Sequence, residues 1–339
     1  MSENVSEKIS RKLGFLPIYN KEKGGTKVKF IAKKIGILFI TLLIISFLSF
    51  FAFSFIPGDA ALSSLGVDAD KAAVEALREE LGLNRPIPVQ YADWLFSALQ
   101  GDFGESTQYH LPVKQLVAQR LPVTITLALY AMVFVVVVAF PLGLLGARKP
   151  EGVLDTIIMI LSQIGMAIPQ FFLGILLTFV FGIVLSLFTV GGYVSYKEDF
   201  IGFLSFLILP AVAVAVPKTA TMVRYIRNTV VAQMKLDYVR TARGKGNSEK
   251  GVLLHHVLKN AMLPVVTMLA MMIADVMAGS IVVEQVFNIP GLGRLLINSI
   301  SNRDYPVVQA IVLYMASVVV LMNTIADILY QKLDPRVKG

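Results

Sequence analysis

One carboxylate in this chain lies where water is not expected. Asp275 falls near the middle of an apolar run, with Met271, Met272 and Met277 close to it. A charged group at that depth of a membrane costs several kcal/mol unless it faces water, meets a partner or takes up a proton. Asp275 is therefore a candidate for the wall of a polar path through a membrane. A hydrogen bond to a neighbouring helix or to a partner subunit is the alternative.

Two other groups have the residue types, but not the spacing, of a catalytic or nucleotide-binding site. His255 and His256 are adjacent, so they point about 100° apart on a helix, and no HExxH or carboxylate framework accompanies them. The residues from Gly244 to Asn247 lack the first glycine and the Ser or Thr of a phosphate-binding loop. Cysteine is absent, which excludes thiolate catalysis and cysteine zinc sites. We therefore expect no enzyme activity, no metal site and no cofactor on this chain.

The composition indicates an all-α polytopic membrane protein. Hydrophobic residues make up 55% of the 339 residues, charged residues make up 16%, and the mean hydropathy is +0.69. Such values are typical of chains with several membrane helices rather than of soluble domains. The net charge of +8 could suggest nucleic acid, but its distribution follows membrane topology instead. We expect contact with membrane lipid and none with nucleic acid.

The sequence divides into a tail, an insert and a core. Residues 1–34 form a basic, cytoplasmic tail, and residues 35–56 lack charge over a length that crosses about 30 Å of hydrocarbon. Residues 57–120 are predicted to be an extracytoplasmic insert of short helices, the last of them running from Pro112 to near Arg120. Residues 121–337 form a core with five further membrane helices. The six expected spans are residues 35–56, 122–147, 153–188, 202–217, 263–283 and 307–330.

Prolines mark the expected irregularities of these spans. Residues 153–188 are too long for one straight crossing and contain Pro169, so we expect one kinked crossing. A turn on the cytoplasmic side, before the membrane section, is the alternative. Pro210 and Pro217 predict irregular backbone in the fourth span, because proline has no N–H to donate.

The distribution of basic residues predicts the orientation. Of the 31 Lys and Arg residues, 23 fall in segments that six spans place inside, and 8 fall in segments placed outside. The insert holds five basic and nine acidic residues, the opposite balance from the tail. Because basic loops stay on the cytoplasmic side, we expect a multi-pass protein of the plasma (inner) membrane with both termini in the cytoplasm.

Residues 222–264 form the longest charged interruption of the core and are predicted to be a helical elbow. Val231, Met234, Tyr238 and Ala242 recur at helical spacing, which predicts one amphipathic helix. Gly244 and Gly246 are expected to end this helix. Ser248 is expected to cap a second helix. The apolar stripe of that helix is Leu253, Leu254, Val257, Leu258 and Ala261.

The elbow resembles a loop of one transporter family. Residues 237–243, 245–246, 253–256 and 260–264 closely resemble the cytoplasmic "EAA" loop of ABC importer permeases. The version with Arg240 in place of the leading acidic residue looks like that of the dipeptide, oligopeptide and nickel branch. The insert motifs LGLNRPIPVQYADWL, GDFG and RLPVT are similar to that branch, as are the residues after the fifth span and the end of the chain. The resemblance covers nearly all of residues 35–337.

The resemblance implies both a fold and a function. The fold is that of a type I ABC importer permease, with six transmembrane helices and an external subdomain after the first. The function is that of the transmembrane subunit of an ATP-driven importer of di- or oligopeptides, forming half of the translocation path. The implied partners are a second homologous permease, two ATP-binding subunits that carry ATP and Mg, and an extracytoplasmic solute-binding protein.

The resemblance also assigns roles to residues. In this family the elbow is the coupling helix, which lies in a groove of the ATP-binding subunit. The matching positions here are Asp237, Tyr238, Val239, Arg240, Thr241, Ala242, Arg243 and Gly246. We expect the apolar face centred on Tyr238, Val239 and Ala242 to make the docking contact. For the translocation path the candidates are Asp275, which could contact the amino terminus of a passing peptide, and Gln163 and Gln170 beside Pro169.

Two alternatives remain open on the sequence. Nickel and oligosaccharide importers belong to the same branch, and the solute-binding protein sets most of their specificity. A self-contained secondary transporter or a membrane-embedded enzyme is the alternative from another class. No internal repeat and no catalytic constellation is detectable to support either of these.

Overall fold

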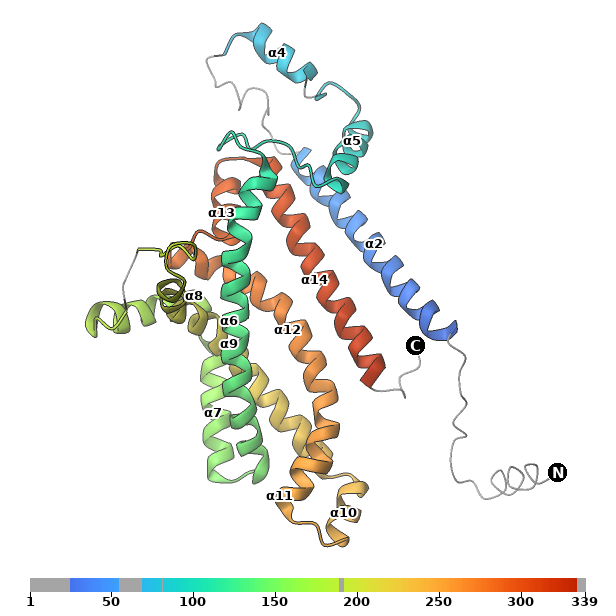
Figure 1. Cartoon of the computed structure of the whole chain (residues 1–339), viewed down its shortest axis with the longest axis vertical. Coiled ribbons are helices and arrows are strands. Elements are labelled where there is room, and N and C mark those ends of the chain that lie inside the picture. The colour runs from blue at the N-terminus through green and yellow to red at the C-terminus, as the bar shows by residue number, and fades with distance from the viewer. Residues whose placement is uncertain (1–24, 55–68, 81, 189–191, 334–339) are drawn as a thin grey trace, which may run out of the picture.

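The described part of the chain is built from helices. The computed structural model describes residues 25–54, 69–80, 82–188 and 192–333, and every named element in these ranges is a helix (Figure 1). Five of the helices are long and apolar enough to cross a membrane, and a bent helix pair supplies a sixth candidate span. Residues 1–24 of the predicted tail lie outside the described ranges. The expected all-α polytopic architecture is confirmed.

Three long helices form the centre of the molecule. They are α6 (Val113–Arg148), α9 (Phe200–Met234) and α12 (Leu258–Val286), and α9 packs against both of the others. Leu127 of α6 and Leu207 of α9 are completely buried. Gly143 of α6 lies so close to Ile226 that an added Cβ would come within 2.8 Å of it. Small residues of this kind let membrane helices approach closely. The van der Waals contacts made at this close approach hold the helices together inside a membrane.

Helix α6 replaces two expected elements, the short helix ending near Arg120 and the second span. It begins after Pro112, as predicted, but runs through Pro122 without a break. A proline inside a helix costs about 3 kcal/mol, whereas each large apolar side chain that becomes buried contributes about 2 kcal/mol. Val123 and Leu127 are both buried in the core. The predicted break was wrong because this packing outweighs the local preference of one proline.

The third apolar run is sharply broken. α7 (Val153–Ala167) is followed by α8 (Gln170–Leu177) and its continuation η1 (Thr178–Val184), and the two halves are bent by 98°. Ile168 and Pro169 between them are extended, since a residue before proline avoids the helical conformation. A kink at Pro169 was predicted, but the 98° bend is much sharper than the expected kinked crossing. Figure 1 shows α8 leaving the long axis of the bundle.

Helix α9 is much longer than the expected fourth span. It continues through Pro210 and Pro217 to Met234, so the irregular backbone predicted at these prolines is absent from it. Pro210 is buried in the core, and the Thr221 hydroxyl donates to the Pro217 carbonyl at 2.9 Å. Packing against α6 and α12 therefore keeps the helix intact where the two N–H groups are missing.

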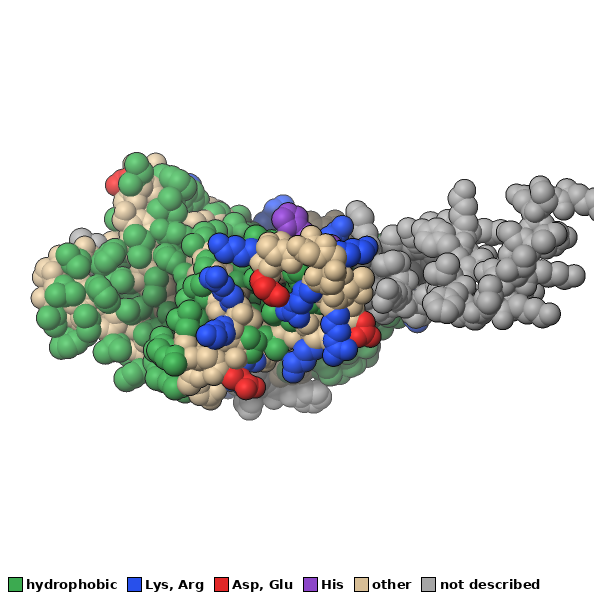
Figure 2. All heavy atoms as spheres, turned by 90° about the horizontal axis from the view of Figure 1, so that it is seen from below, with side chains coloured by type: hydrophobic (Ala, Val, Ile, Leu, Met, Phe, Trp, Pro, Cys, Tyr) green, Lys and Arg blue, Asp and Glu red, His purple; other side chains and the backbone are tan. Residues whose placement is uncertain are grey.

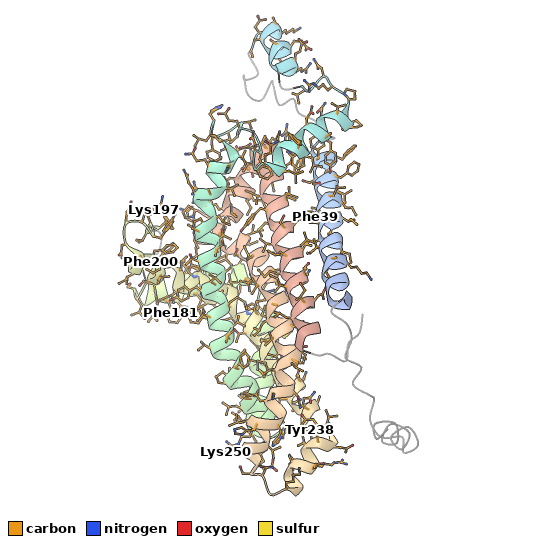
Figure 3. All side chains as sticks on the ribbon, turned by 45° about the vertical axis from the view of Figure 1, so that its right-hand side comes forward. Phe39, Phe181, Lys197, Phe200, Tyr238 and Lys250 are labelled. Carbon is orange, nitrogen blue, oxygen red and sulfur yellow. The ribbon has the colours of Figure 1, made fainter. Side chains whose placement is uncertain are left out.

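The remaining helices lie around this centre. α2 (Gly25–Ser54) packs on α14 (Tyr305–Leu333), and an ion pair between Lys34 and Asp327 joins the start of one to the end of the other. Phe39 on α2, labelled in Figure 3, is 63% exposed, as a lipid-facing side chain would be. α4 (Lys71–Glu80), α5 (Ile87–Leu99) and α13 (Leu292–Ser301) lie toward one end of the bundle, and the elbow lies at the other (Figure 1).

Candidate functional site

The elbow is built from three short pieces between α9 and α12. They are α10 (Asp237–Gly244), α11 (Glu249–Gly251) and η2 (Val252–Val257), which continues directly into α12. The turn after α10 contains Gly246 at φ +81°, a conformation that favours glycine. The Ser248 hydroxyl accepts a hydrogen bond from the Gly251 N–H at 3.2 Å. The predicted glycine turn and the predicted N-cap are both confirmed.

The helix before the glycine turn is interrupted, contrary to the prediction of one amphipathic helix. α9 ends at Met234, and Leu236 is extended with φ −79° and ψ 152° before α10 starts. Asp237 in the first turn of α10 suits the positive end of the helix dipole and favours a new start. The apolar residues Met234 and Tyr238 therefore belong to two different helices.

The apolar side of α10 faces its own chain. Val239 is fully buried and Ala242 is 5% exposed, within the same core cluster as η2 residues Val252 and Val257. The Tyr238 hydroxyl donates to the Gln233 side chain at 2.9 Å. Val239 and Ala242 of the expected docking contact are thus taken up by packing within the elbow, and of the three residues only Tyr238 keeps part of its surface exposed. The exposed side of α10 and its turn is polar, with Asp237, Arg240, Thr241 and Lys245 at the surface, while Leu236 before α10 and Leu254 of η2 are also exposed.

Charged contacts stiffen the elbow and leave cations at its surface. Arg243 donates two hydrogen bonds to Glu249 of α11, at 2.9 and 3.2 Å, and the Asn247 amide donates to the Ala242 carbonyl at 2.9 Å. Figure 2 looks onto this end of the molecule and shows Lys and Arg side chains gathered around it. Tyr238 and Lys250 mark the same end in Figure 3. The elbow is therefore a closed, positively charged cap.

A buried ion pair fixes the base of the elbow. Arg227 near the end of α9 donates to both carboxylate oxygens of Asp155 on α7, at 3.0 and 2.6 Å. Asp155 is 3% exposed and also accepts a hydrogen bond from the Glu151 N–H at 2.8 Å. Paired hydrogen bonds of this kind fix the orientation of both side chains. Sequence analysis did not find this pair, since nothing local links positions so far apart.

Removing the Asp155 carboxylate is expected to destabilise the protein by about 3 kcal/mol, because Asp155→Ala leaves a largely buried arginine without its partner. The measurement is the melting temperature of the purified protein. Asp237→Ala is the matched control, since it breaks an ion pair with Arg240 whose side chains are 94% and 78% exposed. Such surface pairs contribute little. Equal melting temperatures for the two variants would show that the buried pair is not needed.

Asp275 of α12 has a charged partner on α9. Its carboxylate lies 3.4 Å from the Nζ atom of Lys218 on α9, and its side chain remains 68% exposed. Sequence analysis had assigned Lys218 to the cytoplasmic side because the fourth span was expected to end at Pro217. In the structure Lys218 lies near the middle of α9. If the fourth span had been predicted to continue through Pro217, Lys218 would have fallen inside a span, as Asp275 does.

The two predicted glutamines contact α9 and α12, the helices that carry Lys218 and Asp275. Gln163 of α7 accepts a hydrogen bond from Arg224 of α9 at 2.7 Å. Gln170 at the start of α8 lies against Gly279, one helical turn beyond Asp275 on α12, and an added Cβ there would come within 2.8 Å of the amide. The point at which Gln170 meets α12 is thus one helical turn from Asp275. Gln163 belongs to the contact between α7 and α9.

A buried glutamate joins three helices and was not predicted. Glu284 of α12 is completely buried, and one of its carboxylate oxygens accepts from the Thr124 hydroxyl of α6 at 2.7 Å. The other oxygen accepts from the backbone N–H groups of Gly293 and Arg294, at 2.7 and 3.2 Å. These N–H groups begin α13, where a carboxylate also meets the positive end of the helix dipole. Glu284 therefore closes the loop between α12 and α13 onto α6.

A third buried carboxylate, after Asp155 and Glu284, holds the loop before α6. Asp304 at the start of α14 is completely buried; it accepts hydrogen bonds from the Ser106 hydroxyl and from the Thr107 N–H. Asp304 lies among the residues after the fifth span that resemble the family, and no role was predicted for it. The contact ties the segment after GDFG to the last membrane helix.

The histidines contribute no charged cluster to the elbow. His255 and His256 lie on η2 and are exposed, and Nδ1 of His255 lies 3.3 Å from the Gly251 carbonyl. Neither is joined to an acidic residue by a hydrogen bond or ion pair within the described ranges.

Comparison with known proteins assigns the family. Residues 139–339 match the family described as binding-protein-dependent transport system inner membrane component, and residues 27–128 match its N-terminal part. The match includes the elbow, the Lys218–Asp275 pair and both buried carboxylates in the second half of the chain. The first match alone covers more than half of the chain.

Individual relatives align over almost their full length. An oligopeptide transport system permease protein of Bacillus subtilis is 41% identical over 88% of this chain and 95% of its own. A putative peptide transport system permease protein of Brucella abortus is 39% identical over 91% and 98%. A glutathione transport system permease protein of Salmonella choleraesuis is 37% identical over 92% and 99%. The chain therefore belongs to the family of binding-protein-dependent transport system inner membrane components and is a multi-pass permease subunit of an ABC importer, with the type I fold and with ATP hydrolysis on separate subunits.

Proposed function

We propose that this chain forms half of the translocation path of an ATP-driven importer of di- or oligopeptides. The names of its relatives support peptides as cargo, since they include peptide, oligopeptide and glutathione permeases. The observation that carries the coupling role is the shape of α10. Its apolar residues are used within the chain, while its polar side is exposed at the end of the bundle.

The proposed complex contains a second homologous permease, two ATP-binding subunits and an extracytoplasmic solute-binding protein. ATP and Mg would bind to the ATP-binding subunits and not to this chain. The exposed side of α10, with Asp237, Arg240 and Thr241, would lie in a groove of one ATP-binding subunit. Gly246 and the Arg243–Glu249 contact would keep α10 rigid against α11. Movement of the ATP-binding subunits would then reach α9 and α12 through the elbow without being absorbed by it.

The proposed orientation places the elbow and both termini in the cytoplasm. The excess of Lys and Arg in the segments assigned inside supports it. The Lys34–Asp327 ion pair supports it too, because it brings the start of α2 beside the end of α14. α4 and α5 would then lie outside the membrane, where a solute-binding protein could reach them.

Purification and uptake test the proposal together. The tagged chain is extracted gently from its own membrane, and the proteins that accompany it are identified by mass spectrometry. We expect a second permease, ATP-binding subunits and a solute-binding protein. The complex is then placed in vesicles with a labelled peptide and Mg-ATP. Peptide uptake without added or hydrolysed ATP would contradict the proposal, as would recovery of the chain without any of these partners.

The turn at Gly246 provides a sharp test of coupling. Gly246→Pro is expected to lower ATP-dependent uptake at least about tenfold, because proline fixes φ near −65° and loses the N–H that now donates to the Arg243 carbonyl at 2.9 Å. Gly246→Asn is the matched control. Asparagine tolerates positive φ, and no atom lies within 4 Å of an added Cβ. Normal uptake by the proline variant would show that the turn is not part of coupling.

A further inference from the structure

The Lys218–Asp275 contact differs from the other ion pair within the helical core. Arg227 and Asp155 meet at 2.6 Å with a carboxylate that is 3% exposed, which is the geometry of a structural pair. Lys218 and Asp275 are 3.4 Å apart, with side chains that are 21% and 68% exposed. The second pair is therefore loose, and it keeps much of its carboxylate surface free for another partner.

The depth of the pair restricts what the free surface can face. Lys218 lies 16 residues before the end of α9 at Met234, which places it about 24 Å along the helix from the elbow. Charged side chains at such depth avoid lipid and face a water-filled cavity or a polar partner. Because Asp275 is 68% exposed in this subunit, its open side is available to water or to a polar partner.

The surroundings of the pair suit a variable, polar cargo. Met271, one helical turn before Asp275, is 48% exposed, and Met166 of α7 is 40% exposed. Methionine adapts its shape to different apolar groups. Gln170 lies one turn beyond Asp275, against Gly279. Arg224, the nearest further cation on α9, is bonded to Gln163. The varied side chains of a peptide would contact the flexible methionines here. Its α-ammonium and α-carboxylate groups, which every free peptide has, would contact Lys218 and Asp275.

We propose that Lys218 and Asp275 determine specificity on the translocation path by accepting the two charged ends of a peptide. As a peptide passes, its α-carboxylate pairs with Lys218 and its α-ammonium pairs with Asp275 in turn, while the two residues pair with each other at 3.4 Å when the path is empty. This inference rests on the proposed peptide function. Because the peptide contacts replace an ion pair that already exists, binding stays weak enough for the peptide to leave.

The test compares peptides with free and blocked ends in vesicles that contain the whole complex and saturating solute-binding protein. A tripeptide with both ends free, its N-acetylated form and its C-amidated form are taken up in parallel. Asp275→Asn is expected to slow the free tripeptide about tenfold, equivalent to about 1.4 kcal/mol, and to change the N-acetylated form less than about twofold. Lys218→Gln is expected to slow the free tripeptide about tenfold and to change the C-amidated form less than about twofold. Glu198→Gln, at an exposed position shortly before α9, is the control.

A charge exchange separates recognition from a structural role. The double variant with Lys218→Asp and Asp275→Lys restores an ion pair but reverses its direction. If the pair recognises peptide ends, uptake stays low while the melting temperature equals that of the original protein. Restored uptake would overturn the inference, as would equal slowing of all three peptides. If the original complex moves no peptide at all, the proposed function fails instead, so the two failures are distinguishable.

Discussion

Ala242→Asp is expected to lower ATP-dependent uptake about a hundredfold while the chain remains in the membrane. Ala242 is 5% exposed and packs in the same core cluster as Val252 and Val257 of η2. A carboxylate forced into this position costs about 3 kcal/mol or more, which reduces the docked population of α10 about a hundredfold. The long helices α6, α9 and α12 pack independently of α10, so membrane insertion is unaffected.

Uptake is measured in vesicles together with the amount of inserted chain and of recovered ATP-binding subunit. Ala118→Asp is the matched control, because it adds the same group at an exposed position of α6 at the other end of the molecule. It is expected to transport normally. Normal uptake by Ala242→Asp would mean that a docked α10 is not required, and the coupling role of the elbow would be withdrawn.

Replacing Glu284 by alanine is expected to destabilise the protein by about 3 kcal/mol or more. The change leaves the buried Thr124 hydroxyl and two N–H groups of α13 without their acceptor, and each unsatisfied group costs about 1–3 kcal/mol. It also opens a cavity between α6, α12 and α13, which adds to the loss. The measurement is the melting temperature of the purified complex.

Gln285→Ala is the matched control for Glu284→Ala. Gln285 is the next residue along α12 and is exposed, so its truncation is expected to leave the melting temperature unchanged. Glu284→Gln should be intermediate, because an amide keeps one acceptor oxygen but turns N–H donors toward the α13 N–H groups. A melting temperature for Glu284→Ala equal to that of the control would show that α13 is held by its apolar contacts alone.

Features set by a single residue and its neighbours in sequence were predictable. Features in which local helix preference competes with burial in the core were not. The positive φ of Gly246 and the Ser248 cap follow from the chemistry of single residues. Pro122 and Pro217 were expected to interrupt helices, yet tertiary packing keeps α6 and α9 continuous. Propensity is a weak guide wherever burial contributes more.

The candidate site shows the same division. Asp275 could be recognised because a carboxylate in an apolar run is costly wherever it occurs. Its partner Lys218 could not, since the span had been ended too early at Pro217. Val239 and Ala242 were expected to face another subunit, because an apolar stripe does not reveal which surface covers it. Glu284 was seen as part of a pattern, and only the arrangement of α6 and α13 explains why it is there.

The elbow also sets the mechanics of the membrane core. α9 leaves it on one side and carries Lys218, while η2 and α12 leave it on the other and carry Asp275. The two charges therefore lie on two helices that are continuous from the elbow to the charge. Because the elbow is stiff, a movement that it transmits unequally to α9 and α12 must change the separation of the charges. Movement of the ATP-binding subunits and release of the peptide would then be linked directly through the elbow, without any relay of side chains between them.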